Sequence, residues 1–406
     1  MTYSEAIKYL YAQAPMFQQQ GKKAYKTGLE TTEALDAHFG HLHRDFATIH
    51  VAGTNGKGST SHMIAAVLQK AGYKVGLYTS PHLKDFTERI RINGTNMDKQ
   101  AVVDFVKESK GLVESLNPSF FEITTAMAFK YFSDQDIDVA VVEVGLGGRL
   151  DCTNIIAPEI SVITNISKDH TDLLGDDLES IAHEKAGVIK KGTPVVIGET
   201  QKEIQHVFYD KAREVKAPIC YADQQSFGGL PQSDLLGEYQ SKNKQTALTT
   251  LKLLSELGWR IQSKNVVEGF KNVMSLTGMQ GRWQQIGDSP RVICDTAHNE
   301  AGLSYVVSQL KKQECDQLRI VFGVVSDKDV RHILPLLPRN AKYYFVQAKI
   351  PRALDSKELQ KLAMEFGLQG ECYDSIYEGL RKAKEEASVN DLIFVGGSNF
   401  TVAEIL

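Results

Sequence analysis

Residues 53–60 read Gly-Thr-Asn-Gly-Lys-Gly-Ser-Thr and form a glycine-rich turn. The apolar run Phe46–Ala52 precedes the turn, and a helical pattern over Ser61–Ala71 follows it. A strand, a turn and a helix N-terminus in this order bind polyphosphates, because freed backbone N–H groups and the positive helix end face the same anion. The segment therefore predicts a nucleoside triphosphate site, in preference to a generic turn between a strand and a helix.

Individual side chains of the turn have separate expected roles. Lys57 would reach the terminal phosphates, and Ser59 or Thr60 would face a magnesium ion. The spacing departs from G-x-x-x-x-G-K-[ST], because Gly58 separates Lys57 from Ser59. The predicted nucleotide-binding residues of this segment are Gly53, Thr54, Asn55, Gly56, Lys57, Gly58, Ser59 and Thr60.

Composition excludes several classes of protein. A chain of 406 residues suggests two or three domains, and a net charge of −4 gives no electrostatic footprint for nucleic acid. No signal-peptide pattern or membrane-spanning apolar stretch occurs. The five cysteines are far apart and lack a Cys-x-x-Cys pair, which argues against disulfide and zinc frameworks and for a reducing, cytoplasmic location.

Strand-like and helix-like segments alternate through most of the chain. Several strands are continuous Val/Ile runs, which indicates a mostly parallel sheet covered on both faces in a doubly wound α/β domain of P-loop type. The predicted strands of this domain are 48–51, 75–79, 139–144, 161–166 and 194–197, and predicted helices include 99–115, 122–132, 177–190 and 204–215. Turn signals at 276–290 are followed by a second alternation, with strands at 292–295, 319–324, 343–346 and 392–395. We expect a large domain over residues 1–284 and a smaller Rossmann-like α/β domain over residues 285–406.

Glu143 interrupts the apolar run Val139–Val144. A carboxylate in a buried strand costs several kcal/mol unless a positive group meets it. At the carboxyl end of a strand beside a phosphate loop, magnesium is the expected partner. A structural ion pair or a hydrogen-bonded carboxylate is the alternative.

The loop after this strand, residues 145–154, reads Gly-Leu-Gly-Gly-Arg-Leu-Asp-Cys-Thr-Asn. It is not a dinucleotide fingerprint, since Leu150 replaces the third glycine. His170 follows the strand 161–166, where an open sheet places its ligand crevice. A capping or packing role for His170 is equally compatible with its position.

Lys185 lies within the apolar stripe of the helical pattern 177–190. Burial disfavours the charged amine, lowers its pKa and leaves a nucleophile that can take up carbon dioxide as a carbamate, an anion suited to magnesium. A lysine that extends its ammonium to solvent is the alternative.

In the second domain, Asp295 and His298 occupy a strand end that opens a helix, a natural place for ribose or substrate contacts. Five other polar residues lie near breaks between predicted elements, and taken individually most of them would be expected at the solvated surface: Asn243, Arg282, Ser326, Asp327 and Lys328.

With these residues in hand, the chain resembles the folylpolyglutamate synthase/dihydrofolate synthase family, a branch of the Mur-ligase-like ATP-dependent amide ligases. Seven segments carry the resemblance in the right order: His-Val-Ala-Gly-Thr-Asn-Gly-Lys-Gly-Ser (50–59), Tyr-Thr-Ser-Pro-His-Leu (78–83), Glu-Val-Gly-Leu-Gly-Gly-Arg-Leu-Asp-Cys-Thr-Asn (143–154), Asp-His-Thr-Asp-Leu-Leu-Gly (169–175), His-Glu-Lys-Ala-Gly (183–187), Asp-Thr-Ala-His-Asn (295–299) and Asp-Lys-Asp (327–329).

The resemblance implies roles for particular residues. Ser80 and Glu143 would bind one magnesium ion, and His170 with carbamylated Lys185 would serve a second. ATP would contact Gly56–Ser59 and three further residues, of which the last two lie across an interdomain cleft: Asn243, Arg282 and Asp295. The pterin would lie against Ser119, Phe120, Phe121, Leu150, Asp151 and Cys152. Cys152 stands where bifunctional members usually have alanine, which leaves the pterin preference open.

The expected reaction is ATP-dependent ligation of L-glutamate to a carboxylate of dihydropteroate, a reduced folate or both, by a monomer and through an acyl phosphate. Lys57, Glu143, His170 and Lys185 are the predicted catalytic residues. Two alternatives remain at this point. One is a ligase for a UDP-linked cell-wall precursor, and the other is a GTPase-type switch, for which Asp172-Leu-Leu-Gly175 matches a D-x-x-G pattern but no N-K-x-D motif occurs.

Overall fold

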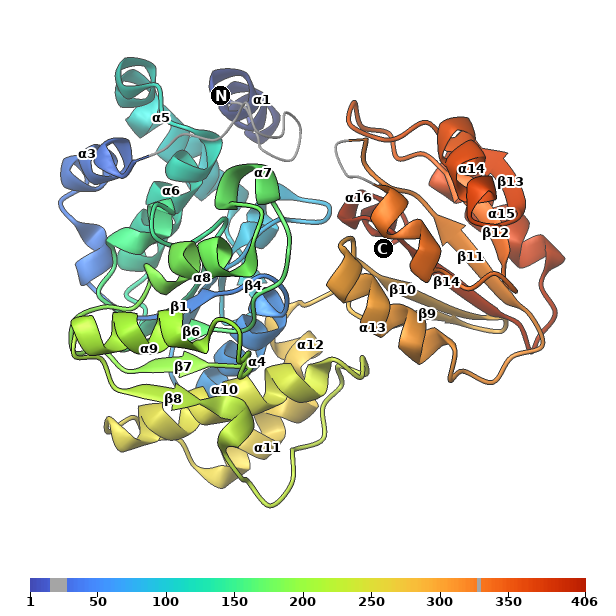
Figure 1. Cartoon of the computed structure of the whole chain (residues 1–406). Helices are drawn as coiled ribbons and strands as arrows, with labels where there is room; N and C mark the ends of the chain where they lie inside the picture. The colour runs from blue at the N-terminus through green and yellow to red at the C-terminus, as the bar shows by residue number, and fades with distance from the viewer. Residues whose placement is uncertain (15–27, 327–329) are drawn as a thin grey trace. The chain divides into compact units, whose positions relative to one another are not determined.

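The computed structural model describes residues 1–14, 28–326 and 330–406 (Figure 1). Contacts divide these residues into two compact units, Met1–Asp234 with Gln240–Met279 and Leu235–Tyr239 with Gln280–Leu406. The short segment Leu235–Tyr239 therefore belongs to the second unit. The predicted domain boundary at residues 284 and 285 stays a prediction, and the segment 327–329 lies outside the described residues.

An eight-stranded sheet forms the centre of the first unit, in the order β4-β3-β2-β5-β1-β6-β7-β8. All neighbours in it pair in parallel except β2 with β3 and β3 with β4. The strands are β1 (Ala47–Ala52), β2 (Val75–Tyr78), β3 (Ile90–Ile92), β4 (Thr95–Asn96), β5 (Val139–Glu143), β6 (Ile160–Ile163), β7 (Val195–Ile197) and β8 (Ile219–Tyr221). Strands β1, β2, β5, β6 and β7 are almost wholly buried, as their continuous apolar runs predict.

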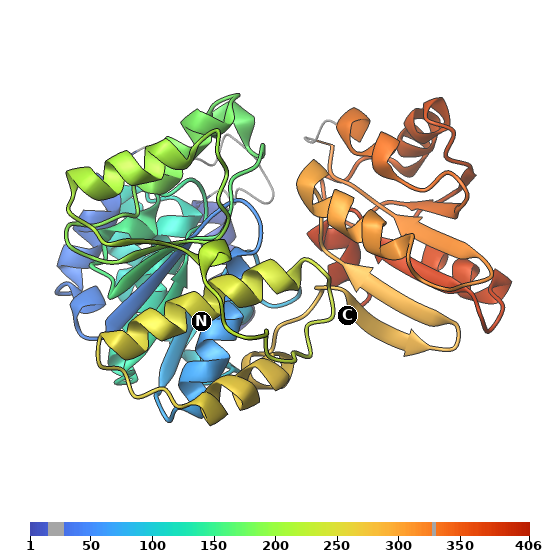
Figure 2. The ribbon, with the colours of Figure 1, turned by 60° about the horizontal axis from the view of Figure 1, so that its bottom comes forward.

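Helices cover both faces of this sheet. Helix α4 contacts β1, β2 and β5 on one face, where α10, α11 and α12 pack against it. The opposite face carries α5 and α6 over one half of the sheet and α8 and α9 over the other, and Figure 2 shows the sheet between the α8/α9 and α4/α10 layers. The helices are α1 (Tyr3–Gln13), α3 (Glu30–His38), α4 (Lys57–Lys70), α5 (Lys99–Leu116), α6 (Phe120–Asp134), α7 (Thr171–Leu174), α8 (Leu178–Ala186), α9 (Gln205–Glu214), α10 (Gln240–Glu256), α11 (Ser263–Lys271) and α12 (Val273–Thr277).

The second unit contains a six-stranded sheet in the order β13-β12-β11-β14-β10-β9, in which only β9 is antiparallel to its neighbour. Alternate residues of β11 face opposite cores: Ile320 and Phe322 pack with α13 and α14, whereas Val321 packs with α15 and α16. The elements are β9 (Gln284–Asp288), β10 (Arg291–Asp295), β11 (Leu318–Phe322), β12 (Lys342–Val346), β13 (Gly370–Tyr373), β14 (Leu392–Gly396), α13 (Glu300–Leu310), α14 (Ser356–Glu365), α15 (Ile376–Glu386) and α16 (Asn399–Ala403). Both units confirm the α/β class.

Two predicted elements end three or four residues earlier in the structure. Helix α8 ends at Ala186 instead of Lys190. The N–H of Val188 donates 3.2 Å to the carbonyl of Lys185, three residues back, and the carbonyl of Glu184 accepts 2.7 Å from the N–H of Arg149. Strand β6 ends at Ile163 instead of Ile166, where the Thr164 hydroxyl turns to donate 2.6 Å to the carbonyl of Asn55. Among the described helices, none has the length and apolar composition needed to cross a membrane.

Candidate active site

The phosphate loop lies between β1 and α4, where two glycines have left-handed backbones. Gly53 has φ 137° and Gly56 has φ 84°. A Cβ at Gly53 would lie 1.9 Å from Thr164 Oγ1, and a Cβ at Gly56 would lie 2.2 Å from Asn243 Oδ1. Both the conformation and the close approach therefore require glycine at these positions.

Residues that follow β6 brace this loop. Thr54 N–H donates 2.8 Å to the carbonyl of Asn165, and Asn55 N–H donates 3.1 Å to Asn165 Oδ1. The Lys57 ammonium folds back to donate to the carbonyls of Gly53 (3.1 Å) and Thr54 (3.2 Å). The predicted cradle and its lysine are therefore held together as one rigid turn at the first residues of α4.

Helix α10 supports the same turn. Gln240 Nε2 donates 3.1 Å to Ser59 Oγ, and Asn243 Nδ2 donates 2.8 Å to Gln240 Oε1. Asn243 is 5% exposed and so is not the solvated residue its position in the sequence suggests. Thr60 Oγ1 is buried and has no hydrogen-bond partner within the described part of the chain.

Glu143 is the last residue of β5 and is 4% exposed. Its Oε2 accepts 3.1 Å from the backbone N–H of Ser80, which follows β2. A Cβ added to Gly58 would lie 3.7 Å from the same oxygen. The carboxylate therefore faces the start of α4, and the structure brings Glu143, Ser80 and the phosphate loop together.

His170 precedes α7 with a left-handed φ of 51°. Its N–H donates 2.9 Å to Asp169 Oδ1, and its Nε2 lies 3.9 Å from that oxygen. The Asp169 side chain is 9% exposed, whereas the His170 ring is 32% exposed. An acidic group therefore accompanies His170 on the segment after β6.

Lys185 is 4% exposed in α8, as its place in the apolar stripe predicts. Burial lowers the pKa of its amine to about 7, and the neighbouring Lys57 ammonium lowers it further, against the opposing effect of Asp169, Asp151 and Glu184. A substantial fraction of this amine is therefore neutral at pH 7, in the electrostatic neighbourhood of the phosphate-loop lysine.

Three of the six residues expected along the pterin, Ser119, Phe120 and Phe121, differ in their surroundings. Phe120 is buried in the core, and the Ser119 hydroxyl caps α6 by accepting 3.3 Å from the N–H of Glu122. Phe121 is half-buried, stacks on Tyr78 with ring centroids 5.6 Å apart and packs against Gly145. Of the three, Phe121 is placed best to offer an aromatic surface beside the loop 145–148.

The loop 145–154 is held by the buried carboxylate of Asp151. It accepts 2.8 Å from the N–H of Leu146 and 3.0 Å from the N–H of Thr153, and burial raises its pKa. Next to it, Leu150 is half-buried and Cys152 is buried, with Thr125 Oγ1 3.8 Å from the Cys152 sulfur.

In the second unit, Asp295 ends β10 and is 2% exposed. Its carboxylate accepts from the hydroxyl of Tyr239 (2.6 Å) and from the N–H groups of Trp283 (2.8 Å) and Ala297 (2.8 Å). Burial raises its pKa, and the charge of Arg282 opposes that rise.

His298 lies three residues beyond Asp295 in the chain, and its Nδ1 is 3.1 Å from the carbonyl of Thr296. Arg282 is half-buried beside the same strand end, and its guanidinium donates 3.4 Å to the carbonyl of Gly281. Arg282, Asp295 and His298 thus belong to the second unit, whereas Asn243 belongs to the first.

Sequence reasoning missed three residues that the structure places against predicted ones: Asp169, Gln240 and Tyr239. Asp169 directly precedes His170, and Gln240 precedes Asn243 by one helical turn. Both could have been predicted as site residues from this closeness in sequence to a predicted one. Tyr239 is 56 residues from Asp295 and had none.

Family models match most of both units. The Mur ligase middle domain matches residues 51–226, and the Mur ligase glutamate ligase domain matches residues 281–399. The chain is 32% identical to the dihydrofolate synthase/folylpolyglutamate synthase of Escherichia coli (strain K12), over 95% of this chain and 92% of that protein. It is 33% identical to a probable bifunctional folylpolyglutamate synthase/dihydropteroate synthase of Haloferax volcanii over 100% of this chain, which spans 50% of that relative's length.

Solved structures agree with this relationship. E. coli FolC in complex with DHPP and ADP has a TM-score of 0.87 and 30% identity, with 100% of this chain and 97% of that chain covered. A bifunctional folylpolyglutamate synthase/dihydrofolate synthase with Mn, AMPPNP and L-glutamate bound has a TM-score of 0.85 and 29% identity, with 100% of this chain and 97% of that chain covered.

The two units, the phosphate loop and the buried strand-end carboxylate thus define a Mur ligase, an ATP-dependent enzyme class. Within that class, the chain belongs to the dihydrofolate synthase/folylpolyglutamate synthase family. The enzyme class expected from the sequence is confirmed, and a GTPase-type switch is excluded. The extent of the match also favours folate enzymes over ligases of UDP-linked precursors.

Proposed function

We propose that this chain joins L-glutamate to the carboxylate of dihydropteroate, a reduced folate or both. The substrate carboxylate attacks the γ-phosphorus of ATP in line and gives an acyl phosphate and ADP. The neutral α-amine of glutamate then attacks the activated carbonyl and releases phosphate. Neither step needs a protein nucleophile, so the protein has to neutralise phosphate charge and align the reacting groups.

The observation that carries this proposal is the buried Glu143 carboxylate facing the first turn of α4, beside a braced phosphate loop and Lys57. A chain that only bound a nucleotide through backbone N–H groups would not need a buried anion there, because that anion repels phosphate. A divalent cation held by Glu143 would supply the positive charge that reconciles them. The proposed ATP contacts are the loop 53–60 and, beyond it, Asn243, Arg282 and Asp295.

The residues present fit magnesium. We assign one ion to Ser80 and Glu143 and a second to His170 and Lys185. The buried hydroxyl of Thr60, which has no hydrogen-bond partner among the described residues, lies in the first turn of α4. Bound magnesium would neutralise the charge that accumulates on the transferred phosphoryl group. Lys57 would add its ammonium to the same phosphates.

Lys185 would enter this set as a carbamate. Its neutral amine adds to carbon dioxide, a C–N bond forms, one proton leaves to solvent, and the side chain becomes an anion. The support is the burial of Lys185, its pKa of about 7 and the cationic Lys57 nearby, which would attract the product anion. A lysine carbamate also extends further than either acidic side chain, which suits a residue placed on α8.

The pterin would lie between Phe121 and the loop that ends in Cys152, and Asp151 would hold that loop in place. His298 is a candidate for contacts with glutamate. The buried sulfur of Cys152, larger than the alanine usual in bifunctional members, makes this position the first place to look for substrate preference. We also propose that the enzyme acts as a monomer.

An ADP-release assay tests the proposed function. The purified chain is incubated with ATP, magnesium and L-glutamate, separately with dihydropteroate and with tetrahydrofolate. Glutamate-dependent ADP release with either pterin, together with the ligated product by mass spectrometry, is expected. ADP release that ignores both glutamate and pterin would overturn the proposal.

A further inference from the structure

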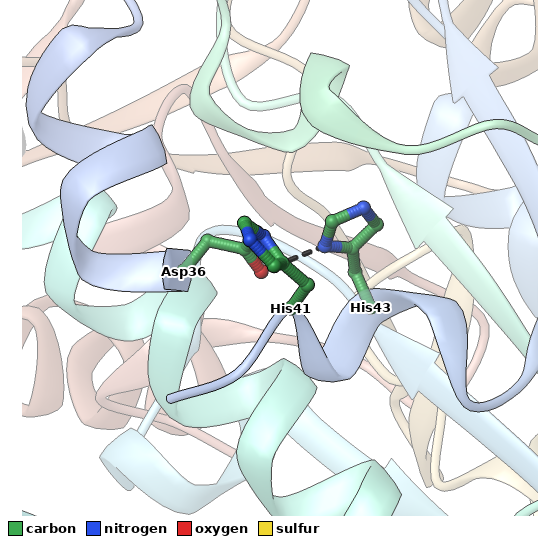
Figure 3. Close-up of side chains that lie close together, drawn as sticks. All are labelled: Asp36, His41 and His43. Carbon is green, nitrogen blue, oxygen red and sulfur yellow. Dashed lines mark hydrogen bonds and ion pairs between the residues drawn. The ribbon is translucent and has the colours of Figure 1, made fainter. Parts of the chain in front are cut away.

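Away from the proposed active site, three side chains that can bind a metal lie around one point in the first unit. Asp36 belongs to the last turn of α3, His41 directly precedes the short 3-10 helix η2 (Leu42–Arg44), and His43 lies within η2. The Nδ1 atoms of the two rings each lie 2.7 Å from a different oxygen of the Asp36 carboxylate (Figure 3). All three ligand atoms lie within 4.8 Å of one another.

The backbone is folded so that both rings reach the carboxylate. His41 has a left-handed φ of 62°, unusual for a residue with a side chain, and its N–H donates 2.9 Å to the carbonyl of Asp36. The side chains of Asp36 and His43 are 9% and 8% exposed, whereas that of His41 is 44% exposed. The cluster is therefore anchored on one side and open to solvent on the other.

We propose that Asp36, His41 and His43 form a zinc site. Two imidazoles and one carboxylate are a ligand set typical of zinc with a fourth position left for water. Each neutral imidazole would move its proton from Nδ1 to Nε2, and the ion would replace that proton between the ring and the carboxylate. Ligand atoms of one zinc ion lie about 3.5 Å apart, so both rings have to move back from the carboxylate by less than an ångström to complete the site.

This site is chemically distinct from the proposed magnesium sites. Magnesium prefers a mostly oxygen ligand set and is a poor match for a site with two imidazoles, whereas zinc, cobalt and nickel accept such a site readily. Excess magnesium should therefore fill the nucleotide site and leave the histidine pair available.

The position of the cluster also gives the ion a structural consequence. Helix α3 contacts α6 and the 3-10 helix η4 (Cys152–Ile155), and the His43 ring lies 6.3 Å from that of Phe129 in α6. An ion that joins the end of α3 to the following turn would hold this helix on the two elements that carry Phe121 and Cys152. Zinc should thus raise the thermal midpoint of the chain.

Zinc titration in competition with a chromophoric chelator tests the proposal, using full-length, metal-stripped protein in excess magnesium and AMPPNP. The parent should take up one more equivalent of zinc than the His41→Gln and His43→Gln variants. His38→Gln, which changes an exposed histidine at the end of the same helix, should match the parent. Because His41 is partly exposed, the His41→Gln variant should fold. Magnesium-dependent ADP release equal to that of the parent would verify that this variant is folded.

Cobalt gives a second readout, since a tetrahedral site with two imidazoles produces visible absorption that His41→Gln should lose. In crystals soaked with zinc, an anomalous peak should lie between the Asp36 carboxylate and the two Nδ1 atoms. Equal zinc uptake by the parent and both variants, or a peak only at the nucleotide site, would overturn the proposal. Asp36 would then serve solely as a hydrogen-bond acceptor for two neutral histidines.

Discussion

The Oε2 atom of Glu143 accepts a hydrogen bond of 3.1 Å from the backbone N–H of Ser80. Glu143 ends β5 and Ser80 follows the end of the neighbouring strand β2, so this bond fixes the carboxylate at the carboxyl edge of the sheet. Because Val51 of β1 pairs with Glu143, the phosphate loop begins directly beside it. The sheet register therefore brings the proposed metal ligands to the proposed phosphate site.

Substitution of Glu143 by Gln separates charge from shape. The amide oxygen can still accept from the Ser80 N–H, but the negative charge is lost. We expect turnover to fall about 100-fold and the magnesium concentration for half-maximal activity to rise. ADP release measured over a magnesium series checks this, with the exposed Glu159→Gln as the control. Unaltered magnesium dependence would make Glu143 a structural residue.

Removal of Lys185 tests the carbamate. Lys185→Ala should reduce turnover by about 100-fold or more, because the proposed anion at the second metal is lost while a cavity remains. Acetate can enter that cavity and should restore part of the activity in a concentration-dependent way. The exposed Lys191→Ala should neither lose activity nor respond to acetate. Parental activity in Lys185→Ala would remove this lysine from the mechanism.

The lowered pKa of Lys185 also has a stability consequence in metal-free protein without carbon dioxide. The pKa is about 7 in the folded chain and 10.5 as the ordinary value. Below pH 7 both states carry the proton, and folding bears the full cost of burying a cation. Between pH 7 and 10.5 the unfolded state binds more protons, so the stability of the folded state rises with pH.

Lys185→Met should therefore stabilise the metal-free chain most below pH 7, and the gain should shrink as pH approaches 10.5. One pKa unit corresponds to about 1.4 kcal/mol, so the effect is large enough to measure. Urea midpoints of parent and variant at pH 6.5 and 9.5 provide the comparison, with Lys191→Met as the exposed control. A pH-independent difference would show that the ammonium is not buried on folding.

Much of this architecture is predictable from local sequence. The glycines of residues 53–60 predict the phosphate loop. The position of Glu143 in an apolar strand and that of Lys185 in an apolar helical stripe predict that both side chains are buried. What escapes prediction depends on packing between distant segments. The carbonyl of Glu184 in the last turn of α8 accepts from the N–H of Arg149, and the carboxylate of Asp295 accepts from the hydroxyl of a tyrosine 56 residues away. Neither contact leaves a periodic signal.

Thr153 links two buried groups, the carboxylate of Asp151 in its own loop 145–154 and the ring of His50 in β1. Its hydroxyl donates to the Asp151 carboxylate and lies 2.8 Å from His50 Nε2. Burial lowers the pKa of His50 to about 3, so the ring is neutral, and its Nε2–H donates to Thr153. The buried Nδ1, which has no partner among described residues, then needs no proton.

Thr153→Val keeps the shape and leaves both neighbours short of one hydrogen bond. We expect a loss of about 1–3 kcal/mol in the free energy of unfolding. We also expect a higher KM for the pterin with a smaller change in kcat, because Asp151 holds the loop. Thr250→Val is the buried control, because the hydroxyl of Thr250 donates to the carbonyl of Thr246 in its own helix. Equal effects of both variants on pterin KM would contradict a positioning role for Thr153.

Tyr239 donates 2.6 Å to Asp295 Oδ2, and burial already raises the pKa of that carboxyl. Tyr239→Phe removes a donor that favours the charged form, so the pKa of Asp295 should rise further. If Asp295 contacts the nucleotide as a carboxylate, KM for ATP should increase as the pH is lowered, and in Tyr239→Phe this increase should begin at a higher pH than in the parent. A KM profile between pH 5 and 8 measures this shift. The control is Tyr305→Phe, whose ring centroid lies 6.5 Å from that of Tyr239, and it should retain the parental pH profile. A parental profile in Tyr239→Phe would show that the charge of Asp295 has no role in nucleotide binding.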